Sequence, residues 1–140
     1  MTPLKIKLTH PLARVPTYAT PGSSAFDLYA TSYGHVPGVF DTGVAFEVPP
    51  GKVLLVNSRS GHGARGVRLA NSQGWIDSDY RDSVRILLDG AAMGVNPGDL
   101  IAQAMLVDAP RVDLQVVEDL SETARGDGGF GSTGGVTVDF

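Results

Sequence analysis

The stretch Leu100-Ile-Ala-Gln-Ala-Met-Leu-Val107 is apolar at every position except Gln103. A strand with one face in water alternates apolar and polar side chains. A run that is apolar on both faces therefore predicts a strand buried twice, once in a core and once against a neighbour. A buried amide costs free energy unless it is hydrogen-bonded, so Gln103 needs a partner. This stretch predicts a β fold built around residues 100–107.

Shorter apolar runs recur along the chain and are separated by turn residues. The 140 residues include 18 glycines and nine prolines, and runs rich in Val, Leu and Ile between such residues are typical of an all-β fold. Leu4, Ile6 and Leu8 share one face of a strand with two lysines on the other, the period of a half-buried strand. We expect further strands at 44–48, 53–58, 84–88 and 112–117, and a single helical turn at 60–65.

The composition limits the class of protein. A chain of this length predicts one domain, and the formal charge of −4 argues against a nucleic-acid scaffold, which needs a basic face. There is no cysteine for a disulfide or a thiolate metal site. No apolar run approaches the roughly 20 residues that span a bilayer, and the N-terminus lacks the layout of a signal peptide. We expect a soluble, intracellular protein of the cytoplasm, or of the host cytoplasm if the chain is viral.

Five segments that carry reactive or binding side chains follow one another along the chain. They are Pro21-Gly-Ser-Ser-Ala-Phe-Asp-Leu28, Arg59-Ser-Gly61, Asn71 to Gly74-Trp-Ile-Asp-Ser-Asp-Tyr-Arg81, Gly98-Asp-Leu-Ile-Ala-Gln103 and Arg125-Gly-Asp-Gly-Gly-Phe-Gly-Ser-Thr-Gly-Gly135. In this order they resemble the five motifs of the trimeric dUTPases, and they extend over nearly the whole chain.

The resemblance implies a fold and an activity. The fold would be a jelly-roll-like β barrel of the β-clip type over residues 1–120, with a flexible glycine-rich arm at 121–140. The assembly would be a homotrimer whose active sites are shared between subunits. The activity would be Mg²⁺-dependent hydrolysis of dUTP to dUMP and pyrophosphate, which limits uracil incorporation into DNA and supplies dUMP for thymidylate synthesis.

The resemblance assigns the phosphate and metal contacts to three of the segments. Arg59, Ser60 and Gly61 match the phosphate-binding motif, and a Ser-Gly pair that opens a turn presents free N–H groups to an anion. Asp27 and Gln103 match the residues that hold the water shell of Mg²⁺, a hard cation that keeps most of its waters. Outside this resemblance, Arg59 would be a solvated surface residue and Asp27 an ordinary carboxylate.

The central segment is assigned to the base, the sugar and the attacking water. Asn71 and the backbone of Gly74, Trp75 and Ile76 match a hairpin that reads uracil with main-chain groups, a device that rejects cytosine because buried groups would stay unpaired. Tyr80 matches the ring beneath the deoxyribose that excludes a 2′-hydroxyl. Asp77 matches the general base for the water that attacks the α-phosphorus. Without the resemblance, Asp77 would read as a turn acid and Tyr80 as a core residue.

The glycine-rich tail matches the fifth motif. Phe130 would stack on uracil, and Arg125, Ser132 and Thr133 would contact the phosphates. Gly131 would also belong to the substrate-binding residues, since the glycines let the backbone wrap closely. The tail also contains G-x-G-x-x-G, but a dinucleotide fingerprint needs a following helix and an acid about twenty residues on, and this chain ends at residue 140. Residues 136–140 alternate like a short strand, with no assigned function.

Three residues depart from the family pattern, and two other functions stay open. His62 stands where the family usually has an apolar residue, Leu100 where a basic residue is common, and Asp82 where glycine is usual. A dCTP deaminase, or the bifunctional enzyme that also cleaves the triphosphate, shares the fold but uses a central glutamate, which this chain lacks between its second and fourth motifs. A trimeric β module with an additional protein-binding role is the other alternative.

Overall fold

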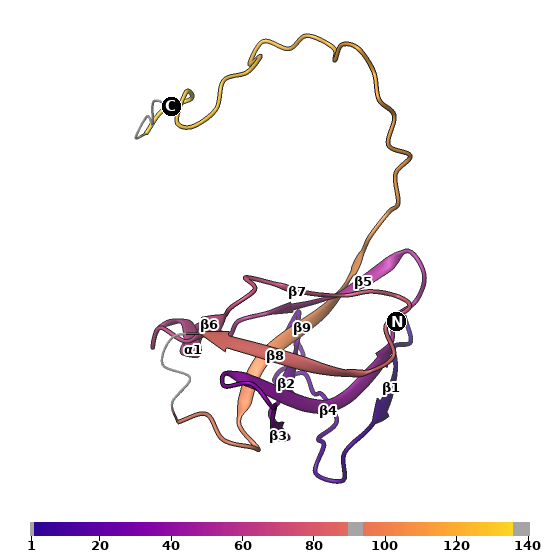
Figure 1. Cartoon of the computed structure of the whole chain (residues 1–140), viewed down its shortest axis with the longest axis vertical. Helices are drawn as coiled ribbons and strands as arrows, with labels where there is room; N and C mark the ends of the chain where they lie inside the picture. The colour runs from indigo at the N-terminus through magenta and orange to yellow at the C-terminus, as the bar shows by residue number, and fades with distance from the viewer. Residues whose placement is uncertain (1, 90–93, 136–140) are drawn as a thin grey trace.

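The computed structural model describes residues 2–89 and 94–135, and its strands form two antiparallel sheets (Figure 1). One sheet has the order β1-β4-β8-β6, with β3 paired to β4, and the other has the order β2-β9-β5-β7. The elements are β1 (Lys5–Leu8), β2 (Phe26–Tyr29), β3 (Ser32–Tyr33), β4 (Val39–Glu47), β5 (Lys52–Asn57), α1 (Ser60–Gly63), β6 (Arg68–Leu69), β7 (Gly74–Ile76), β8 (Ser83–Asp89) and β9 (Leu100–Asp108). The all-β prediction is confirmed.

The core lies between the two sheets. Phe46 and Ile86 come from one sheet and Leu28, Leu54 and Ile101 from the other, and all five side chains are fully buried. Burying a side chain of this size contributes roughly 1.5–3 kcal/mol, so these residues hold the sheets face to face. The core thereby fixes the strand ends on which the candidate site is built.

The strand expected at 100–107 is confirmed by β9. β9 pairs with β2 on one side and β5 on the other, and Ile101, Ala102 and Ala104 are fully buried on it. The predictions at 44–48, 53–58 and 84–88 correspond to parts of β4, β5 and β8, and the single turn is α1. In the described part of the chain, α1 is four residues long, and no helix there is long and apolar enough to cross a membrane.

The first strand is more exposed than its alternating sequence predicts. β1 pairs only with β4, at the edge of its sheet, and Ile6 and Leu8 are 39% and 45% exposed. Of the three apolar residues expected on this face, only Leu4 is among the residues packed against the core. The described residues therefore leave the apolar face of this strand largely uncovered.

The strand expected at 112–117 was a wrong prediction. These residues form no strand, and Val112, Leu114 and Val116 are among the most exposed apolar residues of the chain. Beyond Asp108 the chain leaves the two sheets and follows a wide arc away from them (Figure 1). A strand needs a partner for its backbone groups, and residues 109–135 pair with no described strand. The expected extension at 136–140 lies outside the described residues.

Candidate functional site

A pocket of about 710 Å³ lies where β5 ends beside β9 and β2, and we call it the strand-end pocket. Gln103 on β9 lies opposite Asp27 on β2 and opposite Asn57 on β5, so the sheet register sets the three side chains in one row. The lining consists of Ala19, Ser23, Ser24, Ala25, Asp27, Asn57, Arg59, Ser60, Gly61, Gln103 and Met105. Five of the residues expected at the site, from three separate segments, therefore meet here.

An ion pair crosses this pocket. Arg59 Nε donates a hydrogen bond to Asp27 Oδ1 at 3.1 Å, and the Asp27 side chain is only 12% exposed. Arg59 directly precedes α1 with an extended backbone, which brings its side chain back toward β2. A half-buried carboxylate and guanidinium hold each other in a fixed orientation more firmly than exposed pairs do.

Gln103 has the partner that its buried position requires. Its Nε2 donates to the carbonyl oxygen of Ser58 at 3.0 Å, which leaves Oε1 as an acceptor. The Asp27 carboxylate and this amide oxygen are hard oxygen ligands of the kind that Mg²⁺ accepts directly or through water. The described residues contain no group of three or more His, Cys, Asp or Glu side chains that could hold a metal, so these two residues suit a hydrated ion bound together with an anion.

The turn after Arg59 contributes main-chain donors. The backbone N–H groups of His62 and Gly63 bond to the carbonyl of Arg59. Ser60 and Gly61 precede them, at positions where a helical turn has no acceptor of its own for the N–H groups. Both residues line the strand-end pocket, next to the Asp27–Arg59 pair.

The hairpin around β7 lies outside this pocket. β7 is the edge strand beside β5, and Gly74 is closely packed: a Cβ there would lie 3.1 Å from Val56 Cβ. Ser72 has φ of +65°, the left-handed conformation of a tight turn. Trp75 is 62% exposed. The tip of the hairpin approaches the strand-end pocket only through Gln73 Nε2, which donates to Asn57 Oδ1 at 3.1 Å.

Asp77 and Tyr80 follow β7 on the side away from Asn57. Ile76 pairs with Leu54, three residues before Asn57 on β5, and Asp77 lies one step further along. Asp77 is exposed, and its carbonyl accepts the Tyr80 N–H at 3.2 Å. The Tyr80 hydroxyl donates to the Ser83 carbonyl, and its side chain is 37% exposed. No described residue of 71–80 lines the strand-end pocket.

The arm residues also lie apart from the pocket. Arg125 Nε donates to the Gly128 carbonyl at 2.7 Å, and the Ser132 N–H bonds to the Gly129 carbonyl. Phe130 and Gly131 have φ of +47° and +94°, and the Phe130 ring is 70% exposed. Thr133 is exposed as well. The arm thus forms local turns at a distance from the sheets (Figure 1).

The pocket is also lined by three residues that were not expected from the sequence, Asn57, Ser23 and Ser24. The two serines stand inside the first quoted segment. Asn57 ends an apolar strand with a polar side chain, but its importance depends on lying opposite Gln103, and one strand alone carries no information about that register.

His62, one of the three residues that depart from the family pattern, is a buried histidine. It is 7% exposed, and its Nδ1 has no hydrogen-bond partner among the described residues. Burial lowers the pKa of His62 below its ordinary value of 6.5, and the nearby Arg65 and Arg59 lower it further, against the opposing effects of Asp99 and of the Ile101 backbone. The imidazole is therefore neutral at neutral pH.

We expect this histidine to make the protein less stable in mild acid. Because its folded-state pKa lies below the unfolded value of 6.5, the unfolded chain binds the proton more readily. The stabilisation is fully present above that pH and is lost as the pH falls through the folded-state pKa. Thermal unfolding in phosphate-free buffers between about pH 5 and 8 should show a melting temperature that decreases as the pH is lowered. His62→Leu should flatten this dependence, and an unchanged slope would assign it to other groups.

Comparison with known proteins gives consistent matches. The family model described as dUTPase matches residues 12–134. The deoxyuridine 5'-triphosphate nucleotidohydrolase of Syntrophotalea carbinolica is 40% identical over 141 residues, covering 94% of this chain and 96% of the relative. The enzyme of the same name from Helicobacter pylori strain P12 is 38% identical, with the same coverage. A solved structure, the G164S mutant of Staphylococcus bacteriophage 80alpha dUTPase with dUpNHpp, is similar in fold with a TM-score of 0.81 at 23% identity, covering 96% of this chain and 99% of that chain.

Proposed function

The chain belongs to the dUTPase family, and we propose that it hydrolyses dUTP to dUMP and pyrophosphate with the help of Mg²⁺. The observation that carries the proposal is the strand-end pocket, where Asp27, Gln103 and Arg59 converge beside the turn of Ser60 and Gly61. Such a reaction would limit uracil incorporation into DNA and supply dUMP for thymidylate synthesis.

The strand-end pocket would bind the triphosphate. Arg59 and the N–H groups of Ser60 and Gly61 would bind phosphate oxygens with charge-assisted hydrogen bonds. Asp27 and Gln103 would hold Mg²⁺ through its waters, where the ion would neutralise charge on the phosphates. The ion pair at 3.1 Å between Arg59 and Asp27 supports this role, because it keeps the guanidinium oriented before substrate arrives.

The β7 hairpin would recognise the nucleoside. Asn71 and the main chain of Gly74, Trp75 and Ile76 would bond the uracil edge, and β7, as an edge strand, has unpaired backbone groups to do so. The Tyr80 ring would lie beneath the deoxyribose and exclude a 2′-hydroxyl. Its hydroxyl bond to Ser83 would fix the ring.

Asp77 would act as the general base. A carboxylate need only accept the proton of the attacking water as the new P–O bond forms, after which the P–O bond to the leaving pyrophosphate breaks. Arg125, Gly131, Ser132 and Thr133 of the arm would close over the phosphates and Phe130 over the uracil. Closure would exclude water and hold the triphosphate in line.

We further propose a homotrimer with shared active sites. Within one chain, Asp77 and Tyr80 follow the far end of β7 from the strand-end pocket, so a complete site would need the hairpin of a second subunit. Exposed apolar side chains support assembly, because Ile6, Leu8, Val112, Leu114 and Val116 lie uncovered in a single chain.

Sedimentation equilibrium checks this assembly. The expected particle has three times the 14.6 kDa chain mass. A second test mixes two inactive variants, Asp77→Asn and Gln103→Ala, after joint unfolding and refolding. Sites that combine residues from different subunits should regain part of the activity. An active monomer, or no complementation in a mixed trimer, would contradict shared sites.

The reaction is tested by incubating the protein with dUTP, dCTP and UTP in separate samples with Mg²⁺ and identifying the products. We expect dUMP and pyrophosphate from dUTP, and little turnover of the other two. Ammonia from dCTP would favour the deaminase alternative, although Glu47, Glu118 and Glu122 are the only glutamates and none lies in the central segment. Orthophosphate in place of pyrophosphate would refute the proposal. No turnover of any nucleotide would favour the alternative of a binding module.

A further inference from the structure

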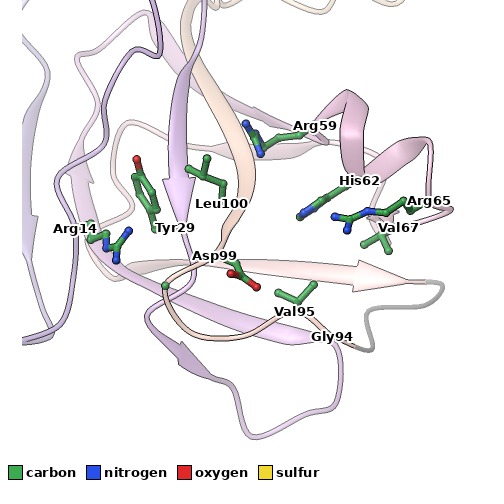
Figure 2. Close-up of a pocket in the computed structure, with 11 residues that line it drawn as sticks. Arg14, Tyr29, Arg59, His62, Arg65, Val67, Gly94, Val95, Asp99 and Leu100 are labelled. Atoms are coloured by element: carbon green, nitrogen blue, oxygen red, sulfur yellow. The ribbon is translucent and has the colours of Figure 1, made fainter.

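A second pocket adjoins the strand-end pocket, and Arg59 lines both. It has a volume of about 700 Å³ and lies between β2, α1 and the loop that leads into β9 (Figure 2). Its charged lining consists of Arg14, Arg59 and Arg65 against the single carboxylate of Asp99. We call it the arginine pocket. Three guanidinium groups thus face one carboxylate, in a chain whose formal net charge is −4.

The carboxylate of Asp99 is already engaged within its own loop. Its Oδ2 accepts the Asn96 N–H at 2.8 Å, and its own N–H bonds to the Asn96 carbonyl. No ion pair joins Asp99 to an arginine in the described part of the chain, since the pairs within 4.0 Å involve other carboxylates. The positive charge of the arginine pocket is therefore only weakly balanced.

Two of the three arginines have no carboxylate of their own among the described residues. The Arg14 guanidinium lies over the Tyr29 ring, 5.2 Å from its centroid, a contact that orients the cation and leaves its charge uncancelled. Arg65 is exposed and appears in no ion pair there. By contrast, Arg68 pairs with Asp89 at 3.2 Å. Unbalanced cations around one hollow attract a counter-ion.

His62 gives a second, independent indication. Its ring lines the same pocket, it is 7% exposed, and its Nδ1 has no hydrogen-bond partner among residues 2–89 and 94–135. Figure 2 shows the ring extending from α1 between Arg59 and Arg65. A buried polar atom without a partner is rare in folded proteins and suggests a ligand or ordered water.

We propose that the arginine pocket binds a small phosphate-class anion, either pyrophosphate or inorganic phosphate. The fork of N–H groups on an arginine matches two phosphate oxygens at once, and Nδ1 of His62 could bond the anion once it carries a proton. Pyrophosphate as the ligand in the cell rests on the proposed function, which would release it next to Arg59. Anion binding itself does not depend on that function.

The test titrates the full chain with pyrophosphate, and separately with phosphate, by calorimetry without nucleotide or metal. Arg14 and Arg65 are exposed, so the double variant Arg14→Gln, Arg65→Gln should fold normally. Hydrogen bonds to charged groups are strong, and we expect this variant to bind pyrophosphate at least about tenfold more weakly. Arg68→Gln removes one arginine charge outside the pocket and should leave the affinity unchanged.

Two further measurements distinguish binding in the arginine pocket from binding in the strand-end pocket, and the anion site from the proposed hydrolysis. The His62 ring signals in NMR should move on addition of pyrophosphate, with a rise in the pKa of His62 caused by the bound anion. Gln103→Ala, which removes a side chain that lines the strand-end pocket but not the arginine pocket, should still bind pyrophosphate. No binding by the parent protein, or loss of binding in Gln103→Ala but not in the double arginine variant, would overturn the proposal. Pyrophosphate binding without dUTP hydrolysis would refute only the proposed function.

Discussion

Asp77→Asn should lower the turnover of dUTP by at least about 100-fold, the usual scale of general-base catalysis. The amide has nearly the shape of the carboxylate but cannot take the proton of the attacking water. Asp77 is exposed and its carboxylate holds no described hydrogen bond within the fold, so the substitution should not unfold the chain. Binding of a non-hydrolysable dUTP analogue should stay within a few fold of the parent.

Asp79→Asn is the matched control for this prediction. Asp79 stands two residues away in the same exposed segment and carries the same charge, but the family pattern assigns it no catalytic role. Its substitution should change turnover by no more than a few fold. If Asp77→Asn retains comparable turnover, another group takes the proton, and the central assignment of the site is wrong.

The parts of the fold that follow from sequence are those set by local pattern. The apolar run around Ile101 predicts a central strand, because its burial on two faces can be read from composition alone, and β9 confirms it. Leu8 and Val116 show what a local pattern cannot predict, namely whether an apolar side chain is covered. Their patterns predict coverage, yet both are exposed in one chain. Coverage of a strand depends on what packs against it, and that partner is not encoded within a few residues.

In the candidate site, too, some residues could be predicted from the sequence and others depend on the fold. Asp27, Arg59 and Gln103 could be proposed from the resemblance of short motifs to a family pattern, which can be recognised without knowledge of the fold. Asn57 could not, since its place in the pocket depends on the β5–β9 register. The arginine pocket could not be predicted from the sequence either. Arg14 and Arg65 are 51 positions apart in sequence, and only folding brings both into the lining of one pocket.

Removal of residues 125–140 should abolish most of the activity and leave the fold intact. None of the described residues of this segment belongs to the core, and the two sheets end at Asp108, so the melting temperature should be nearly unchanged. The lost residues include Arg125 and Phe130, which would orient the phosphates and the base. Loss of such positioning typically costs on the order of 100-fold or more in rate. Steady-state hydrolysis and thermal unfolding of the same preparation measure the two effects.

A scrambled arm is the control that distinguishes specific contacts from chain length. It keeps the length and the glycine content of the segment, but loses the order of the fifth motif. We expect it to be as inactive as the truncated chain.

Phe130→Ala alone should weaken binding of a dUTP analogue by about 1–3 kcal/mol, the range of base stacking on an aromatic ring. If the truncated chain hydrolyses dUTP at the parent rate, the arm takes no part in catalysis. If it unfolds, the arm is an integral part of the barrel, because only a segment that contributes to the core or to subunit contacts can have that effect.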